Sequence, residues 1–271
     1  MAFFKLCSDD MLVNTLRTVF RANVIRIPEA RFRPLTVVAL GDNDKPQFWG
    51  YLGELLEDSL PDTQAVVEES PMADVSGKRS KSVSIDLGLE ILKGFLSGFR
   101  LPSAAISAKF TGAKTVSFSF QDVMRYFISP IRVGNLLEGQ ALKAGHAANK
   151  IFFRRQARLL VIDSIITSKD FSISVDKAST NDFSLNIPAI EQMVGQARAG
   201  VQVSSQSSLD ITFQGNTPLT FAFTYIRCDI DEAGRIELVP GTAPVNFQPG
   251  EPATHELLFE EPGMIEISVT G

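Results

Sequence analysis

The sequence is poor in the residue types that most often carry enzyme chemistry. Its 271 residues include only two histidines and two cysteines. His146 and His255 each stand apart from any Cys/His/Glu cluster with the spacing of a zinc site, so we expect no metal. The glycines form neither a GxGxxG loop nor a GxxxxGKS or GxxxxGKT phosphate loop. We therefore expect no catalytic residues, and a hydrolase that pairs a cysteine with His146 is the alternative.

Long apolar runs are also missing. No stretch of about 18 or more apolar residues occurs, so no membrane-spanning helix is predicted. The opening residues, MAFFKLCSDD, hold an apolar run that is too short for a signal peptide and is interrupted by Lys5. Cys7 and Cys228 do not make a disulfide framework. We therefore expect a cytoplasmic protein with reduced thiols, and we expect Cys228 to lie in the core.

Basic residues are absent from the end of the chain. The formal net charge of −5 argues against a nucleic-acid-binding protein. The last basic residue is Arg235, and residues 236–271 hold six glutamates and no Lys or Arg. Residues 1–235 carry all 26 basic side chains and 25 of the 31 acidic ones. The negative charge therefore belongs to the C-terminal segment.

A proline-rich linker lies within this acidic segment. Residues 240–254 hold four prolines, and exposed segments of this kind are preferred sites of proteolysis. We therefore divide the chain into a body (residues 1–240), a protease-sensitive linker (residues 241–254) and a C-terminal peptide (residues 255–271). Because the linker lacks Lys, Arg and Asp, we expect a cut beside a small or apolar residue. The expected cleavage region comprises Val245, Asn246, Phe247 and Gln248.

The C-terminal peptide carries apolar side chains that we expect to dock on the body. They are Leu257, Leu258, Phe259, Met264, Ile265, Ile267 and Val269. Their burial is worth roughly 10–20 kcal/mol, and ordering the segment costs a similar amount. The peptide would then stay docked mainly because its tether holds it at about millimolar effective concentration. A cut near Phe247 removes five glutamates and leaves a neutral body that approaches an anionic membrane more easily.

Apolar and polar residues alternate in several segments, which predicts two-faced strands. The apolar members are Val83, Ile85, Leu87, Leu89, Phe171, Ile173, Val175, Phe183, Leu185, Val201, Val203, Leu209 and Ile211. Their polar neighbours are rich in Ser, Asn and Gln. A transmembrane barrel needs strands of about 9–11 residues with one apolar and one polar face. These strands are therefore candidates for membrane insertion after lengthening, and an ordinary soluble sheet is the alternative.

Other local patterns predict the elements around these strands. Residues 8–23 have the apolar spacing of a helix, and residues 35–51 read as a hairpin with its turn at Asp42–Asp44. A polar connection is expected over residues 61–80, and a bend at Gly94–Gly98. Pro188 is expected to open a short helix.

Five segments, in order along the chain, resemble bacterial gasdermins of the short form. They are FRPLTVVALGDNDKPQFWGYLGELLED (32–58), AKTVSFSFQDVMRYFISPIRVGNLL (113–137), RLLVIDSIITSKDFSISV (158–175), SLNIPAIEQMVG (184–195) and LDITFQGNTPLTFAFTYIRC (209–228). The resemblance implies an α+β fold with a twisted, mostly antiparallel central sheet surrounded by helices, like the N-terminal domain of gasdermins. It also implies that residues 1–240 form a pore-forming domain and that residues 255–271 inhibit it.

The resemblance further implies how such a protein works. A monomer waits in the cytoplasm until a partner protease removes the inhibitory peptide. Freed bodies then bind membrane lipids and assemble with one another into a large β-barrel pore in the cell inner membrane. The strands of the pore come from about 70–118 and 163–215. The pore kills the infected cell as an antiviral defence. The resemblance also implies a palmitoyl group on Cys7 and no other cofactor. The alternative for Cys7 is a partly buried free thiol. A soluble lipid-binding or scaffold protein, whose tail is only a terminal structural strand, is the alternative function.

Overall fold

The structure is a computed structural model, and it describes residues 23–41, 46–61, 63–71, 83–110, 113, 115–175, 184–197 and 199–239. The chain divides into two compact units, and each is considered by itself. Unit 1 comprises the described parts of 1–31, 70–125 and 166–222, and unit 2 those of 32–69, 126–165 and 223–271. Cys7, the turn at Asp42–Asp44, the linker and the C-terminal peptide lie outside the described residues, as does nearly all of the helix predicted over residues 8–23.

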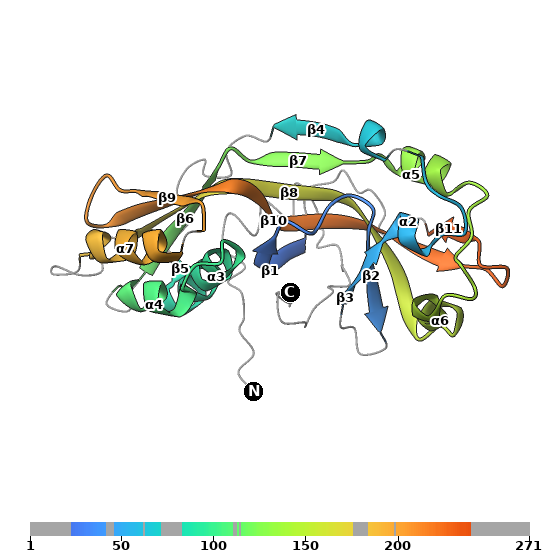
Figure 1. Cartoon of the computed structure of the whole chain (residues 1–271), viewed down its shortest axis with the longest axis horizontal. Coiled ribbons are helices and arrows are strands. Elements are labelled where there is room, and N and C mark those ends of the chain that lie inside the picture. Colours follow the sequence, from blue (N-terminus) through green and yellow to red (C-terminus); the bar gives the residue numbers. More distant parts are fainter. Residues whose placement is uncertain are drawn as a thin grey trace, which may run out of the picture. The chain divides into compact units, whose positions relative to one another are not determined.

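Unit 1 contains a sheet of mostly antiparallel strands. They are β1 (Asn23–Glu29), β5 (Val83–Ser84), β6 (Thr115–Gln121), β9 (Val201–Ser204) and parts of β8 (Ala157–Val175) and β10 (Asp210–Ile230). β6 pairs with β5 and β8, β9 pairs with β10, and β10 lies between β1 and β8 (Figure 1). The strands predicted around Ile173 and Ile211 are therefore confirmed.

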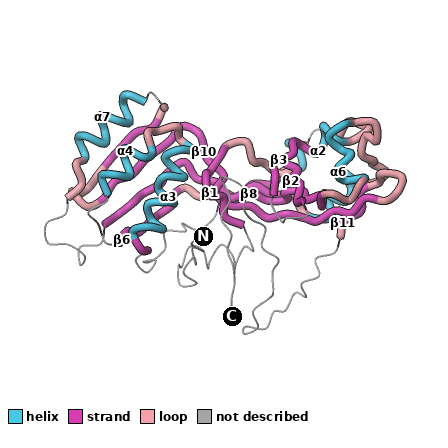
Figure 2. Tube along the Cα trace, turned by 90° about the horizontal axis from the view of Figure 1, so that it is seen from below, coloured by secondary structure: helices cyan, strands magenta, loops and turns pink. Residues whose placement is uncertain are grey.

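Helices cover one side of this sheet. They are α3 (Ile85–Gly98), α4 (Ser103–Ser107) with the 3₁₀ turn η2 (Ala108–Phe110), and α7 (Ile187–Ala197). Figures 1 and 2 show α3, α4 and α7 on the same side of β6, β8 and β10. α7 begins after Asn186, whose Oδ1 accepts a hydrogen bond from the backbone N–H of Ala189 at 3.1 Å. The helix predicted to open near Pro188 is thus confirmed.

The alternation over residues 85–91 led to a wrong prediction, because this segment is the first half of α3 and not a strand. The physical reason lies in the second half of α3 and in Phe99, the residue that follows the helix. Leu92, Phe95, Leu96 and Phe99 are all buried, and successive positions differ by three, one and three residues. This spacing places them on one helical face, and burying that face selects the helix. The bend predicted at Gly94–Gly98 is wrong for the same reason.

Two smaller predictions also differ from the structure. Leu185, which is predicted in a strand, lies outside any strand and two residues before α7 begins. The polar connection predicted over residues 61–80 contains the 3₁₀ turn η1 (Gln64–Val66) and a short strand, β4 (Glu68–Pro71), which pairs with β7 (Met124–Phe127). Strand pairing can hold such a polar segment in an ordered conformation even though it buries few side chains.

Unit 2 is built around the hairpin of β2 (Thr36–Gly41) and β3 (Pro46–Tyr51), which confirms the predicted one. Its other elements are α2 (Leu52–Leu55), α5 (Pro130–Leu137), η3 (Ala147–Asn149), α6 (Lys150–Phe153) and β11 (Ile236–Leu238). β2 also pairs with β8, and β11 pairs with β10. Trp49 ties β3 to the following helices, because its Nε1 donates to the Ala148 carbonyl at 3.2 Å and its ring meets Phe152 edge-on at 6.0 Å. Cys228 is buried in this unit, as predicted.

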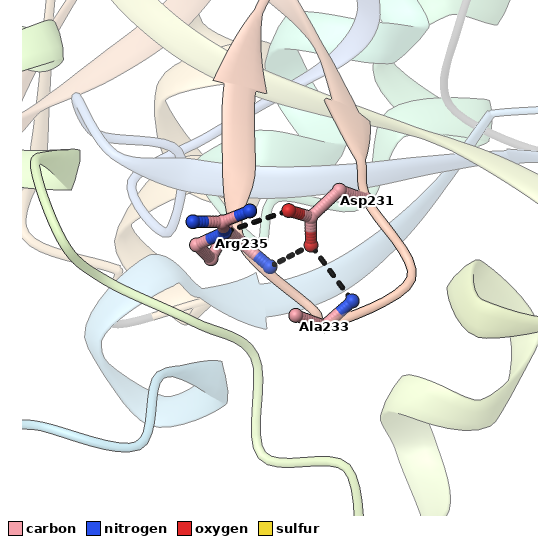
Figure 3. A network of polar contacts seen from close by, with 3 residues as sticks. All are labelled: Asp231, Ala233 and Arg235. Atoms are coloured by element: carbon pink, nitrogen blue, oxygen red, sulfur yellow. Dashed lines mark hydrogen bonds and ion pairs between the residues drawn. The ribbon is translucent and has the colours of Figure 1, made fainter.

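A polar network closes the turn between β10 and β11 (Figure 3). Asp231 Oδ1 accepts hydrogen bonds from the backbone N–H groups of Ala233 at 2.9 Å and Arg235 at 2.8 Å, and its Oδ2 accepts one from Arg235 Nε at 2.7 Å. The Arg235 side chain and these N–H groups hold the pKa of Asp231 below its usual range. Gly234, with φ of +83°, lets the chain pass close to the ring of Phe153.

Candidate membrane-inserting segments

The apolar residues predicted on β8 form one buried face in unit 1. Phe171, Ile173 and Val175 are each at most 4% exposed. Their cross-strand partners on β6 are Phe120, Phe118 and Val116. Directly paired residues of antiparallel strands point to the same side of the sheet, so Phe171 and the buried Phe120 share one apolar face. The register of these two strands therefore matches the pattern that the sequence predicts.

The predicted residues of β9 and β10 extend this face. Ile211 is buried, and Val201, Val203 and Leu209 are partly buried and packed against the same core. Val203 pairs with Phe213 of β10, and the Leu209 carbonyl accepts a hydrogen bond from the N–H of Val175 at 2.7 Å. The structure thus brings together the predicted residues of β8, β9 and β10 on one side of the sheet.

The opposite side of these strands carries small polar residues. Ser172 and Thr212 are half-buried, and their hydroxyl oxygens lie 2.7 Å apart in a hydrogen bond between β8 and β10. Ser174 and Gln214 are exposed. Gln214 Nε2 donates to Asp170 Oδ2 at 3.2 Å, which joins the same two strands once more. Each strand therefore has one apolar face under helices and one polar face of hydroxyl and amide groups, with the carboxyl group of Asp170 among them.

A cluster of phenylalanines fastens α3 to the apolar face. The ring of Phe95 stacks on Phe171 with centroids 4.6 Å apart and also contacts Phe120 at 4.8 Å. Phe120 stacks in turn on Phe221 at 4.6 Å. We name these four residues the phenylalanine cluster. The sequence analysis missed Phe95 and Phe221 as site residues, although the helical spacing from Leu92 to Phe99 was a signal that could have found Phe95.

A second close contact joins the end of α3 to β10. An added Cβ at Gly215 would lie 2.3 Å from Cε1 of Phe99, so only glycine fits beneath this ring. Gly215 lies in β10, opposite Val201 of β9. Together with the phenylalanine cluster, this contact holds α3 over the strands.

The remaining predicted site residues fall into two groups. Val83 lies in the two-residue strand β5, which pairs with β6, while Ile85, Leu87 and Leu89 lie in α3. Leu185 is buried in the core of unit 1 beside α7. The others lie outside the described residues and stay predictions: Cys7, Phe183, Val245, Asn246, Phe247, Gln248, Leu257, Leu258, Phe259, Ile265, Ile267 and Val269.

No helix in the described part of the chain is long and apolar enough to cross a membrane. The same residues hold no group of three or more His, Cys, Asp or Glu side chains that could bind a metal ion. The burial of Cys228, together with the neighbouring Asp229, raises the pKa of its thiol to about 12, so this cysteine is a poor nucleophile at neutral pH.

The mostly antiparallel sheet and the helices that cover it form an α+β fold of the gasdermin-like class. The model of the Bacterial Gasdermin Family matches residues 25–235, and the chain belongs to this family. Gasdermins are pore-forming proteins and not enzymes. The expected family and the expected fold class are both confirmed.

Individual relatives agree with the family match. The chain is 26% identical over 268 residues to Gasdermin bGSDM of Vitiosangium sp. (strain GDMCC 1.1324), with 97% of this chain and 98% of the relative covered. It is 31% identical over 244 residues to Gasdermin bGSDM of a Desulfuromonadales bacterium, with 86% of each chain covered. The solved structure of a bacterial gasdermin from Bradyrhizobium tropiciagri superposes with a TM-score of 0.61 at 17% identity, over 86% of this chain and 92% of that one.

Proposed function

We propose that this gasdermin is an autoinhibited pore former that is activated when a partner protease removes residues 255–271. The resting monomer lies in the cytoplasm. Cleavage within Val245–Gln248 frees the body, which binds membrane lipids and oligomerises into a large β-barrel pore in the inner membrane. The outcome is death of the infected cell as a defence against phage.

The observation that carries this proposal is the two-faced sheet of unit 1. The apolar face of β6, β8, β9 and β10 is buried under α3, α4 and α7, while the other face carries Ser, Thr and Gln side chains. Lipid chains can take the place of the helices against the apolar face. The backbone N–H and C=O groups stay hydrogen-bonded between neighbouring strands, so none of them is left unpaired in the lipid. Within the region expected to insert, residues 163–215, β8 already runs from residue 163 to Val175, which is longer than the about 9–11 residues that a spanning strand needs.

The charge distribution supports the role given to the C-terminal segment. The linker and peptide carry five of the six glutamates that follow Arg235, and no basic residue. Cleavage therefore removes the whole net negative charge of the chain along with the peptide. A neutral body meets less repulsion at an anionic inner membrane. A palmitoyl group on Cys7 would add about 0.8 kcal/mol of membrane affinity for each buried CH₂ group.

Controlled cleavage of the full chain tests the proposal. Residues 245–248 are replaced by the recognition sequence of a site-specific protease, and the protein is mixed with dye-loaded liposomes of bacterial inner-membrane lipids. We expect dye release only after the protease is added, and none from a variant with a scrambled recognition sequence. If complete cleavage at several points between Thr242 and Thr254 releases no dye, the proposal is wrong.

Labelling of neighbouring residues tests the predicted orientation of the strands. Val203 lies on the apolar side of β9, and Gln202 beside it is exposed. An environment-sensitive dye on Val203→Cys should be quenched by nitroxides on lipid chains after cleavage, whereas the same dye on Gln202→Cys should not. The scaffold alternative predicts no quenching at either position and only a lower free energy of unfolding after the peptide is lost.

A further inference from the structure

A buried carboxyl group lies where three strands of unit 1 meet. Asp170 of β8 is only 6% exposed. Its Oδ2 accepts a hydrogen bond from Gln214 Nε2 of β10, but its Oδ1 is buried without a hydrogen-bond partner among the described residues. A buried charged oxygen without a partner is costly, so the ionised form of this side chain is poorly accommodated in the resting sheet.

A second carboxyl group faces Asp170 from the connection between β6 and β7. Gln121 of β6 is the cross-strand partner of Asp170, which places Asp122 beside it, and Asp122 adopts a left-handed conformation with φ of +50°. Burial raises the pKa of Asp170, the hydrogen bond from Gln214 opposes this, and the negative charge of Asp122 raises the pKa further. Two carboxyl groups can share a hydrogen bond only when one of them carries a proton.

The surrounding hydrogen bonds connect this pair to the strands on either side. Ser168 Oγ donates to the Gln121 carbonyl of β6 at 2.7 Å and accepts from the N–H of Asp170 at 3.1 Å. Gln214 joins Asp170 to β10. Asp170 therefore sits in a network that ties β8 to β6 on one side and to β10 on the other. β6 lies at the end of the first region expected to lengthen on insertion (about 70–118), and β8 and β10 belong to the second region (about 163–215).

We propose that Asp170 is a positioning residue that locks β6, β8 and β10 together when it is protonated and loosens them when it ionises. In the protonated form its O–H donates to Asp122 and satisfies the otherwise unpaired oxygen. When the proton leaves to solvent, two carboxylates face each other at this junction. Lys169 of β8 offsets part of this repulsion, Gln214 of β10 is neutral, and β7 carries one charged residue, Arg125. The role in pore formation rests on the proposed function, whereas the lock itself does not.

The sign of the pH dependence follows from the direction of the pKa shift. The folded chain binds the Asp170 proton more tightly than the unfolded chain, whose carboxyl has an ordinary pKa of 3.8. The stabilisation is thus complete below that pH and is lost as the pH rises through the pKa of the folded state. Acidification should strengthen the resting sheet, and a rise in pH should weaken it.

The first experiment measures the lock in the uncleaved full chain. Urea unfolding is followed by circular dichroism between pH 4 and pH 8 for the wild type, Asp170→Asn and the control Glu237→Gln, whose side chain is exposed on β11. In the wild type the folded-to-unfolded ratio should fall with rising pH by up to about tenfold per pH unit within the window between the two pKa values. Asp170→Asn, which donates to Asp122 at every pH, should lose this component, while Glu237→Gln should keep it.

Equal pH slopes for the wild type and Asp170→Asn would overturn the inference. If Asp170→Asn does not fold, Asp122→Asn provides the second test, because removal of the facing charge should lower the pKa of Asp170 and flatten the same slope. An unchanged slope in Asp122→Asn would then overturn the inference.

The second experiment separates the lock from the pore. Dye release after cleavage is measured from pH 5 to pH 8, and we expect the rate to rise with pH in the wild type more steeply than in Asp170→Asn. Release with the same pH profile in both proteins overturns the role in insertion and leaves the pore intact. No release at any pH, together with pH-dependent stability, overturns the proposed function and supports the lock.

Discussion

The clearest quantitative prediction concerns Phe95, the residue that α3 contributes to the phenylalanine cluster. Its ring is 4% exposed and contacts Phe171, Phe120 and Phe221 with centroids 4.6, 4.8 and 6.3 Å away. Phe95→Ala removes this ring from a packed interior and leaves a cavity above the strands. Substitutions of this kind lower the free energy of unfolding by about 3–5 kcal/mol. Part of this loss comes from the aromatic pairs, each of which contributes about 0.5–1.5 kcal/mol in addition to the burial of its surface.

The effect should be concentrated in α3, because this side chain joins the helix to the sheet. Urea unfolding should give the loss in free energy of unfolding, and hydrogen exchange should show where it falls. We expect the amides of residues 85–98 to exchange much faster in the full-length Phe95→Ala protein, even under native conditions. In the liposome assay, the cleaved variant should also release dye faster, since the proposed insertion requires α3 to leave the sheet.

The matched control is Phe152→Ala in unit 2. Phe152 is 3% exposed and contacts Trp49, so its loss should destabilise the chain by a similar amount. In this variant the faster exchange should appear in α6 and β3, and α3 should stay protected. The reasoning is refuted if Phe95→Ala leaves the exchange of α3 unchanged, or if both variants accelerate α3 equally.

Two glycines should respond to alanine with opposite signs. Gly215→Ala forces a Cβ to within 2.3 Å of Phe99 and should lower the free energy of unfolding by about 1–3 kcal/mol. Gly195→Ala in α7 meets nothing within 4 Å and should raise it by about 0.5–1 kcal/mol, as thermal melts of both variants would show. With a thiol pKa of about 12, Cys228 should be roughly one ten-thousandth thiolate at pH 8 and should resist alkylation in the native full chain. Peptide mapping should find it modified only in urea, and rapid native alkylation at this position would contradict the burial.

Local alternation was sufficient to predict the strands but not their surroundings. Polar and apolar residues alternate over 171–175 of β8 and 210–214 of β10, and the structure keeps that period of two as two opposite faces. For residues 85–91 the same signal failed, because a short window fits both a strand and a helix. What decides between them is the burial of Phe95 and Phe99 against strands far away in the chain, which no local pattern contains.

The polar junction of the site was equally out of reach. Asp170 follows Lys169 in the sequence and looks like one half of an exposed charged pair. Only the register of β6 against β8 places Asp122 beside it, and only the arrangement of β8 and β10 brings Gln214 to its carboxyl group. Because both neighbours are more than 40 residues away, their effect on the pKa of Asp170 depends on tertiary structure alone.

The two regions that are proposed to enter the membrane are prepared for it unequally. In the second region, β8 and β10 are already strands whose hydrogen bonds and faces suit a barrel, and α7 is the intervening helix. In the described part of the first region, alternating residues are held in α3, and the strands are the end of β4, β5 and β6. The first region must therefore break a helix and its contacts with Phe171 and Gly215 before it can pair as a hairpin. Since strand formation in the second region needs fewer new hydrogen bonds, release of α3 is the step at which the resting fold resists insertion most.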